Sequence, residues 1–283
     1  EPSMVEDVIE GNSFPEGLQG QNIARTIALL AGLPNEVPGQ TVNRYCSSGL
    51  QTIAHAANQI IADQADVIVA GGIELMSAVP MGGNEPTNNP ILQDEDSGVS
   101  YPMGLTAEMV AETYHVSRED QDAYAVQSHQ RVAEAQQSGK FDDEIIPIEV
   151  NQVTYDDNGP VVSKAVFKED ELIRPDTNKE TLAKLPTVFK ADGTVTAGSS
   201  APLTDGSGFV VVMSGEKVKE LGVEPIARFV GFKAVGVNPK LMGIGPAYAI
   251  PEVLEQANLD VNDIDLVELN EAFASQTLAS MRE

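Results

Sequence analysis

The 283-residue sequence contains no tryptophan and a single cysteine, and aromatic residues make up only 5% of it. One cysteine can form neither an internal disulfide nor a cysteine-based metal cluster. No apolar run approaches the roughly 20 residues that a membrane-spanning helix needs. The chain opens on Glu1-Pro2 without a charged-then-apolar leader. We therefore expect a cytoplasmic protein, neither secreted nor embedded in a membrane.

Basic residues are also scarce, because 17 Lys and Arg stand against 43 Asp and Glu and leave a formal net charge of −26. A field of that sign repels nucleic acid and anionic membrane surfaces, so we expect neither as a partner. The charge itself is typical of a solvated acidic surface. A polyanionic ligand would have to be bound by local backbone dipoles and a few well-placed cations.

The order of elements around the cysteine predicts an α/β fold. Residues 41–45 are strand-like, and from Cys46 to about Asp63 apolar residues recur at helical spacing. Residues 66–70 then form an apolar run of buried-strand type, closed by two glycines. This order of strand, helix and strand predicts a parallel sheet with packed helices.

The same criteria predict the other elements of the chain. Further strands are expected over 208–214, 226–231 and 264–269, and further helices over 22–31, about 105–115, 117–139, 215–221 and about 247–257. Ser117, with Asp120 three residues on, is the expected cap of the helix over 117–139.

A short internal repeat predicts a duplicated architecture. Residues 7–12 (Asp-Val-Ile-Glu-Gly-Asn) and 265–270 (Asp-Leu-Val-Glu-Leu-Asn) both read as a strand that ends in Asn before a Phe. With strand–helix order at both ends of the chain, two α/β halves are the better interpretation. We predict an N-terminal half over 1–215, with a smaller domain inserted at about 77–200, and a C-terminal half over 222–283.

Cys46 is the strongest candidate for a catalytic residue. It lies at a strand-to-helix junction, where the first helical N–H groups lack backbone partners and the helix dipole favours a negative charge. A thiolate is the nucleophilic form of cysteine. Ser47, Ser48 and Gly49 follow and leave room for a substrate carbonyl, and the glycine costs roughly 1 kcal/mol of helix propensity. We therefore interpret Cys46 as a nucleophile rather than a packing residue.

These residues belong to a longer series of motifs. Val-Asn-Arg-Tyr-Cys-Ser-Ser-Gly-Leu at 42–50 and Val-Ala-Gly-Gly-Ile-Glu-Leu-Met-Ser at 69–77 resemble the nucleophile region of thiolases. The resemblance covers essentially the whole chain in order. It continues in Tyr-Pro-Met-Gly-Leu-Thr-Ala-Glu-Met at 101–109, Ser-Arg-Glu-Asp-Gln-Asp-Ala-Tyr-Ala at 117–125, Gly-Thr-Val-Thr-Ala-Gly at 193–198 and Asn-Glu-Ala-Phe at 270–273.

The resemblance implies duplicated α-β-α-β-α halves with an inserted loop domain, and an acyl-CoA:acetyl-CoA C-acyltransferase that is a homodimer or homotetramer. In thiolases the cysteine attacks a 3-ketoacyl-CoA, acetyl-CoA leaves, and coenzyme A then removes the acyl group from the cysteine. Cys46 matches that nucleophile, and Asn270 matches the asparagine that holds a water in the oxyanion hole. Coenzyme A and acyl-CoA are substrates, and we expect no metal and no resident cofactor.

The resemblance also implies residues that contact the substrate. They are Met103 in the acyl pocket, Arg174 near the adenine of coenzyme A, and Phe189, Ala197 and Phe273 along the pantetheine channel. Ala201 stands where many thiolases have a serine that contacts the pantetheine. Ser199 or Ser200 is the candidate to replace it.

The family pattern places two further catalytic groups, a histidine in Gly-His-Pro and a second cysteine in Cys-x-Gly, beyond Glu283, and a first strand before the first residue. The histidines present do not replace that base. His55 lies roughly 13 Å along the helix axis from Cys46. His115 and His129 read as solvated helix residues.

The resemblance also favours one class of thiolase over another at a single position. Biosynthetic thiolases often carry a His-Met pair where this chain has Pro102-Met103, which favours a degradative 3-ketoacyl-CoA thiolase of fatty-acid β-oxidation over an acetoacetyl-CoA thiolase. Two other classes remain open. A ketoacyl-carrier-protein synthase shares the fold but needs a basic docking face, which the net charge of −26 opposes. A catalytically inactive fragment that keeps the fold is the other.

We expect the 283 residues, purified alone, to show negligible steady-state thiolysis of acetoacetyl-CoA, because the chain lacks the family's general base. The measurement is the loss of the substrate's enolate absorbance in the presence of coenzyme A. Robust turnover would show that the histidine beyond Glu283 is not needed.

Overall fold

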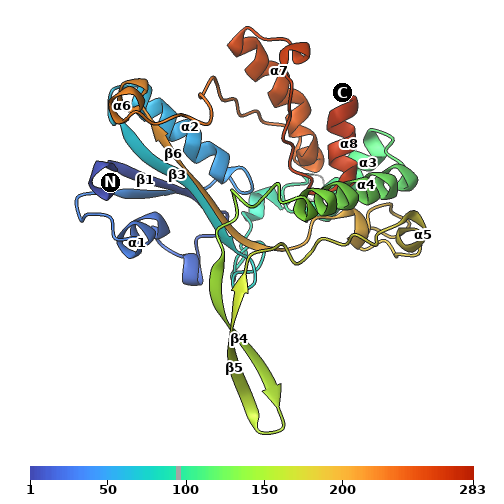
Figure 1. Cartoon of the computed structure of the whole chain (residues 1–283). Coiled ribbons are helices and arrows are strands. Elements are labelled where there is room, and N and C mark those ends of the chain that lie inside the picture. The colour runs from blue at the N-terminus through green and yellow to red at the C-terminus, as the bar shows by residue number, and fades with distance from the viewer. Residues whose placement is uncertain (94–96) are drawn as a thin grey trace. The chain divides into compact units, whose positions relative to one another are not determined.

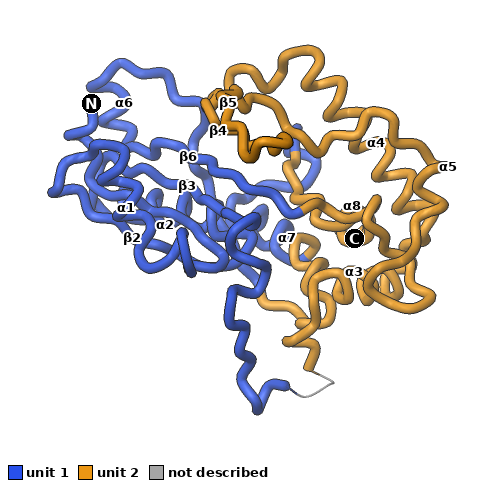
Figure 2. The backbone as a smooth tube through the Cα atoms, turned by 90° about the horizontal axis from the view of Figure 1, so that it is seen from below, with its two compact units in different colours: residues 1–94, 203–235, 248–266 blue, residues 95–202, 236–247, 267–283 orange. Residues whose placement is uncertain are grey.

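The computed structural model describes residues 1–93 and 97–283 of the chain. Its contacts divide the chain into two compact units (Figure 2). Unit 1 comprises Glu1–Asp94, Leu203–Val235 and Tyr248–Leu266, and unit 2 comprises Glu95–Pro202, Gly236–Ala247 and Val267–Glu283. The division into halves over 1–215 and 222–283 stays a prediction. Among the described residues, no helix combines the length and apolar character needed to cross a bilayer.

Unit 1 is built on a four-stranded sheet (Figure 1). Its strands are β1 (Asp7–Gly11), β2 (Gly39–Val42), β3 (Val67–Leu75) and β6 (Asp205–Met213), in the order β2-β1-β3-β6. The first three run parallel, and β6 pairs antiparallel with β3. The parallel sheet predicted around the cysteine is therefore confirmed.

Helices cover both faces of this sheet. Neighbouring residues of β1 point to opposite faces, and each packs against a different helix. Val8 packs against Ala24 and Ala28 of α1 (Ile23–Leu30). Its neighbour Ile9 packs against Ala56 of α2 (Ser48–Ile61). The third helix of this unit, α6 (Gly215–Leu221), ends at Gly222 with φ of 64°.

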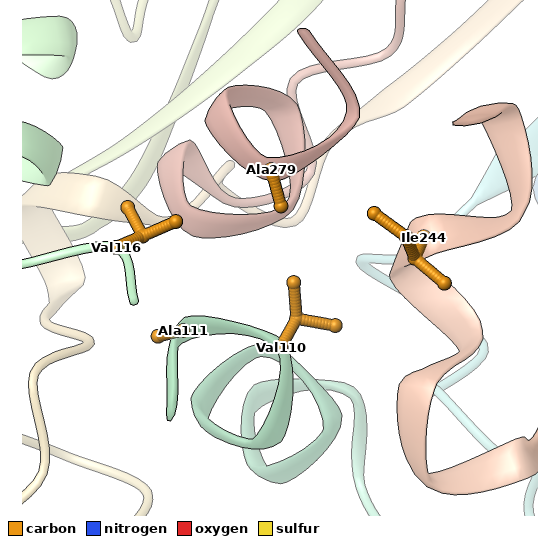
Figure 3. Close-up of a cluster of buried hydrophobic side chains, with 5 residues drawn as sticks. All are labelled: Val110, Ala111, Val116, Ile244 and Ala279. Carbon is orange, nitrogen blue, oxygen red and sulfur yellow. The ribbon is translucent and has the colours of Figure 1, made fainter. Parts of the chain in front are cut away.

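Unit 2 is mainly helical. It contains α3 (Met103–Thr113), α4 (Arg118–Gln137), the short α5 (Lys179–Leu182) and α8 (Ala274–Arg282), whereas most of α7 (Gly245–Ala257) belongs to unit 1. The predicted cap of α4 is confirmed, because Ser117 Oγ accepts from Asp120 N at 3.0 Å. Figure 3 shows the core of the unit, where buried side chains from α3, the connection between α3 and α4, α8 and the 3-10 segment Pro239–Ile244 meet. They are Val110, Ala111, Val116, Ile244 and Ala279.

A β-hairpin in unit 2 was not predicted. Strands β4 (Ile148–Asp156) and β5 (Gly159–Phe167) pair antiparallel through nine residue pairs, and most of their side chains are exposed. The local signal was Asn158-Gly159, a dipeptide that favours tight hairpin turns. Gly159 adopts φ of 120°, and Asn158 N donates to Asp156 Oδ1 at 2.7 Å.

Two predicted strands are wrong. In the structure, residues 226–231 and 264–269 lie outside regular strands, so the second copy of the internal repeat forms no strand, while the first copy is β1. A strand exists only where its backbone groups find partners on a neighbouring strand. Neither segment pairs with another strand among the described residues. The predicted helices at 22–31, 215–221 and 247–257 are confirmed to within two residues at each end.

Glu10 lies on β1, one of the two inner strands of the sheet, where a buried acidic side chain is unusual. Its side chain is fully buried on the α1 face of β1, and neither carboxyl oxygen has a hydrogen-bond partner among the described residues. Burial raises its pKa to about 7, because desolvation disfavours the charged form, and the negative charge of Glu74 adds to the rise. Thr41 and the backbone of Ile73 lie near enough to offset part of this rise in pKa, although neither forms a well-aligned hydrogen bond with the carboxyl.

We predict that Glu10→Gln stabilises the protein at alkaline pH. Because the pKa of Glu10 rises from 4.5 to about 7 on folding, its contribution to stability is intact below the lower value and is lost as pH rises through the higher one. Near pH 8.5 the free energy of unfolding of Glu10→Gln should exceed that of the unchanged chain by about 3 kcal/mol.

The check is urea denaturation of both proteins across this pH range. Below about pH 4.5 the two free energies should converge, because the carboxyl is then neutral in both folded and unfolded states. The exposed Glu36→Gln is the control and should show no such pH dependence. A constant difference between Glu10→Gln and the unchanged chain would mean that Glu10 is ionised at neutral pH.

Candidate active site

Cys46 lies in the turn between β2, which ends at Val42, and α2, which begins at Ser48. Its side chain is exposed. The structure therefore confirms the predicted junction, with the helix starting two residues later than its sequence pattern suggested. The exposed sulfur can be reached by a reagent from solvent.

Glycines let the start of α2 approach the strand ends. A Cβ atom on Gly11, the last residue of β1, would lie 2.5 Å from the carbonyl carbon of Ser48. One on Gly72 of β3 would lie 3.3 Å from the Cα atom of Gly49. Thr52 reinforces the contact, because its hydroxyl donates to the Gly71 carbonyl at 3.0 Å. Larger residues at these strand ends would push the helix away and move Cys46 with it.

The N–H groups next to Cys46 are used within the turn. Ser47 N donates to Arg44 O at 3.2 Å, and Ser48 N donates to Tyr45 O at 3.0 Å. These two groups are therefore engaged with carbonyl oxygens rather than open to an anion. The start of α2 would therefore stabilise a thiolate mainly through the helix dipole, rather than through these two N–H groups.

In unit 2, Asn270 and Phe273 belong to the segment that enters α8. The backbone carbonyl of Asn270 accepts from Gln276 Nε2 at 3.2 Å, and Gln276 Oε1 accepts from Phe273 N at the same distance. The buried Gln276 thus holds both ends of the Asn-Glu-Ala-Phe motif. The Asn270 side chain itself is exposed.

Two of the predicted substrate residues, Phe189 and Ser200, contact a third, Phe273. The rings of Phe189 and Phe273 meet edge to face, with centroids 6.0 Å apart. Ser200 forms an isolated β-bridge with Phe273, and the short 3-10 turn Ala197–Ser199 precedes it. Gly104, next to Met103, faces the Phe189 ring, which a Cβ atom there would overlap at 2.2 Å.

The serines near Ala201 differ in their surroundings. Ser199 is buried, and its hydroxyl donates to Thr196 O at 3.3 Å. Ser200 is half-buried and donates to the same carbonyl at 2.7 Å. Ala201 is exposed and donates its N–H to Ala272 O at 2.9 Å. Of the two candidates to replace the family serine, Ser200 is the more accessible.

Arg174 lies beside a histidine that sequence reasoning placed in solvent. Arg174 N donates to His129 Nδ1 at 3.2 Å, and His129 is half-buried. Burial lowers the pKa of His129, and the nearby Arg174 charge lowers it further, while the carboxylate of Glu271 acts in the opposite direction. His129 is therefore not the freely solvated helix residue that was predicted.

Glu271 connects this region to the Asn270 motif. Its carboxylate accepts from the Tyr124 hydroxyl and, at 2.6 Å, from Ser128 Oγ, both on α4. Burial and the Glu271 charge raise the pKa of Tyr124. Tyr124 therefore stays a neutral donor that anchors the residue next to Asn270.

Sequence reasoning also passed over Glu108 of α3. Its buried carboxylate accepts from Thr194 N at 2.8 Å and from Val195 N at 2.8 Å, and Thr194 Oγ1 lies 3.2 Å away. These bonds hold the Gly-Thr-Val-Thr-Ala-Gly loop that leads to Ala197. The available signal was a charged residue at a position of α3 that helical periodicity assigns to the core.

The structure thus places Cys46 in unit 1 and brings Phe189, Ser200 and Phe273 together in unit 2, to which Met103 also belongs. Asn270, Arg174 and Ala197 also belong to unit 2. Within the described part of the chain, no three side chains of the types His, Cys, Asp or Glu gather as a possible metal site.

Comparison with known proteins defines the class. Residues 1–216 match the family described as thiolase, N-terminal domain, and residues 223–283 match thiolase, C-terminal domain. The chain belongs to the thiolase family, and it is a thiolase-type acyl-CoA acyltransferase.

Individual relatives agree with this assignment. The chain is 49% identical over 280 residues to a 3-ketoacyl-CoA thiolase of Bacillus subtilis, covering 99% of this chain and 72% of that protein. It is 42% identical over 295 residues to a probable acetyl-CoA acyltransferase of Staphylococcus epidermidis, covering 100% of this chain and 73% of that protein.

Solved structures show the same fold. The Bacillus anthracis acetyl-CoA acetyltransferase and the human mitochondrial 3-ketoacyl-CoA thiolase each match with a TM-score of 0.87 and 41% identity. Each match covers 100% of this chain and 72% of the other. The predicted thiolase fold is confirmed.

We predict that Glu108→Ala destabilises the protein by about 3 kcal/mol or more, because it leaves buried backbone donors of Thr194 and Val195 without partners. The measurement is the free energy of unfolding in urea. Glu112→Ala, one turn further along α3, removes an exposed ion pair with Lys190 and should change stability little. Equal effects of the two substitutions would contradict the anchoring role of Glu108.

Proposed function

We propose that this chain carries the acyl-transfer site of a degradative 3-ketoacyl-CoA thiolase, with Cys46 as the nucleophile. The observation that supports it most is the exposed sulfur just before α2, a helix whose first turn packs closely against Gly11 and Gly72 of the sheet. The name of the Bacillus subtilis relative, 3-ketoacyl-CoA thiolase, points to the same reaction.

In the proposed reaction, the Cys46 sulfur attacks the keto carbon of a 3-ketoacyl-CoA. The bond between the second and third acyl carbons breaks, and the carbanion that departs is protonated and leaves as acetyl-CoA. An acyl-cysteine remains on Cys46. The thiol of coenzyme A then loses its proton to a base and attacks this thioester. The bond between the acyl carbon and the Cys46 sulfur breaks, the acyl group leaves as a shortened acyl-CoA, and the free cysteine is restored.

Unit 2 supplies the proposed binding and oxyanion groups. The exposed amide of Asn270 is suited to hold a water against a developing oxyanion, because Gln276 holds the Asn270 carbonyl and the next residue, Glu271, is bound to α4. The paired rings of Phe189 and Phe273 offer an apolar wall for pantetheine. Arg174 offers a cation for the phosphates of coenzyme A in a chain whose net charge of −26 otherwise repels them.

The alternative within the class is an acetoacetyl-CoA thiolase. It is favoured by the likeness to the Bacillus anthracis acetyl-CoA acetyltransferase. Pro102, the N-cap residue of α3, supports the degradative assignment, because it stands where biosynthetic thiolases often have histidine. The cytoplasmic location, the homo-oligomeric state, the absence of a resident cofactor and the inactivity of these residues alone stay predictions.

We predict that incubation with a 3-ketoacyl-CoA leaves one acyl group on Cys46 and that Cys46→Ala abolishes the adduct, because the thioester forms on this sulfur. Intact-protein mass spectrometry measures the adduct, and peptide mapping places it. An adduct of acetoacetyl-CoA that forms much faster than one from a long-chain 3-ketoacyl-CoA would favour the acetoacetyl-CoA thiolase. An adduct that persists in Cys46→Ala would overturn the proposal.

A further inference from the structure

The turn that presents Cys46 contains a residue in an unfavourable backbone conformation. Ser47 N donates to Arg44 O at 3.2 Å, so Tyr45 and Cys46 occupy the two central positions of the turn. Tyr45 adopts φ of 47°, a left-handed conformation that glycine adopts without penalty and a tyrosine does not. Something other than the local preference of Tyr45 must therefore hold this turn.

Asn43 holds the peptide group before Tyr45. Its Oδ1 accepts from Tyr45 N at 2.8 Å, and its Nδ2 donates to Ser13 O at 2.8 Å. Ser13 is tied to the sheet in turn, because its N–H donates to the Glu74 carboxylate of β3 at 2.8 Å. The asparagine thus links the turn to the loop that follows β1.

Ser48 holds the peptide group after Tyr45. Its hydroxyl donates to Tyr45 O at 2.5 Å and accepts from Arg44 N at 2.8 Å. Ser48 is 3% exposed and lies against Gly11, so its position is set by the contact between α2 and β1. The N–H and the C=O of Tyr45 are therefore both held by side chains, one from each side of the turn.

We propose that Asn43 and Ser48 are positioning residues for Cys46. They stabilise the left-handed conformation of Tyr45, and that conformation holds the Cys46 sulfur at the start of α2, where it can react. The inference deepens the proposed function and rests on it, since it takes Cys46 to be the nucleophile. Neither residue touches the reacting atoms.

The sizes of the opposing effects make this testable. The steric penalty of a left-handed tyrosine is of the same order as the net gain from one hydrogen bond. The loss of either bond should therefore tip the turn toward other conformations and lower the population that holds Cys46 in place. Substitution of Tyr45 by glycine removes the penalty, so it should restore that population in the weakened variants.

The experiment measures the rate at which iodoacetamide labels Cys46 in the folded 283-residue chain at neutral pH. Cys46 is the only cysteine, so the mass increase of the intact protein reports on it alone. We expect Asn43→Ala and Ser48→Ala to label about fivefold more slowly than the unchanged chain, the factor that corresponds to one ordinary hydrogen bond. Adding Tyr45→Gly to either variant should return the rate to within about twofold of the unchanged chain.

Two further variants sharpen the test. Asn43→Asp keeps the acceptor for Tyr45 N and loses the donor to Ser13 O, so it should label faster than Asn43→Ala. Ser47→Ala removes a hydroxyl whose one hydrogen bond within residues 1–93 and 97–283 is to Arg44 O at 3.0 Å, and it leaves both contacts of Tyr45 intact, so its rate should match the unchanged chain. Thermal unfolding of every variant shows whether a slower rate merely follows a loss of overall stability.

The outcomes separate the two proposals. If Cys46 of the unchanged chain labels no faster than in urea, the proposed nucleophile itself is wrong. If it labels faster, but Asn43→Ala and Ser48→Ala label at the same rate as the unchanged chain, the positioning role is wrong. Slow labelling that Tyr45→Gly does not restore also overturns it, because strain at Tyr45 is then not what the two residues oppose.

Discussion

The contact of the start of α2 with the carboxyl end of β1 and with Gly72 of β3 is the constraint on which the proposed site depends. It requires glycine at Gly11, because any side chain there would overlap Ser48. Once the helix is seated, Ser48 is buried in a position from which its hydroxyl reaches the backbone on both sides of Tyr45. The position of Cys46 therefore follows from backbone packing in the sheet, several residues away from the sulfur.

In unit 2, side-chain hydrogen bonds likewise hold the loops that carry predicted substrate residues. Buried or half-buried polar side chains on α3 and α4 hold two loops that carry predicted substrate residues. Glu108 binds the backbone at Thr194 and Val195, and Tyr124 and Ser128 bind Glu271. In both units, residues with a proposed chemical role are held in position by polar neighbours that have no proposed role in the chemistry. A buried carboxylate with several donors is suited to this task, because breaking its bonds leaves unsatisfied groups in a medium that penalises them.

Glu10 shows the opposite case, a buried carboxyl whose oxygens have no partner among the described residues. Its raised pKa means that the folded state keeps the group partly neutral near pH 7. Glu108 and Glu10 have the same side chain and similar burial, and they differ in the donors around them. Burial alone therefore does not tell whether an acidic residue stabilises a fold, and only the local geometry distinguishes the two.

Much of the molecule could be predicted from the sequence. Hydrophobic periodicity located α2 and β3, Ser117 marked the start of α4, and the ordered motifs around Cys46 and Asn270 indicated the thiolase family. These features are local, since they depend on residues within a few positions of each other. The hairpin β4–β5 could have been recognised from Asn158-Gly159. The segments 226–231 and 264–269 have the apolar pattern of strands, but among the described residues neither pairs with another strand.

What only the tertiary structure decided was which groups meet across long separations: Gly11 with Ser48, Asn43 with Ser13, Glu108 with Thr194, Tyr124 with Glu271. Pairing and packing of this kind depend on chain folding that no short window of sequence contains.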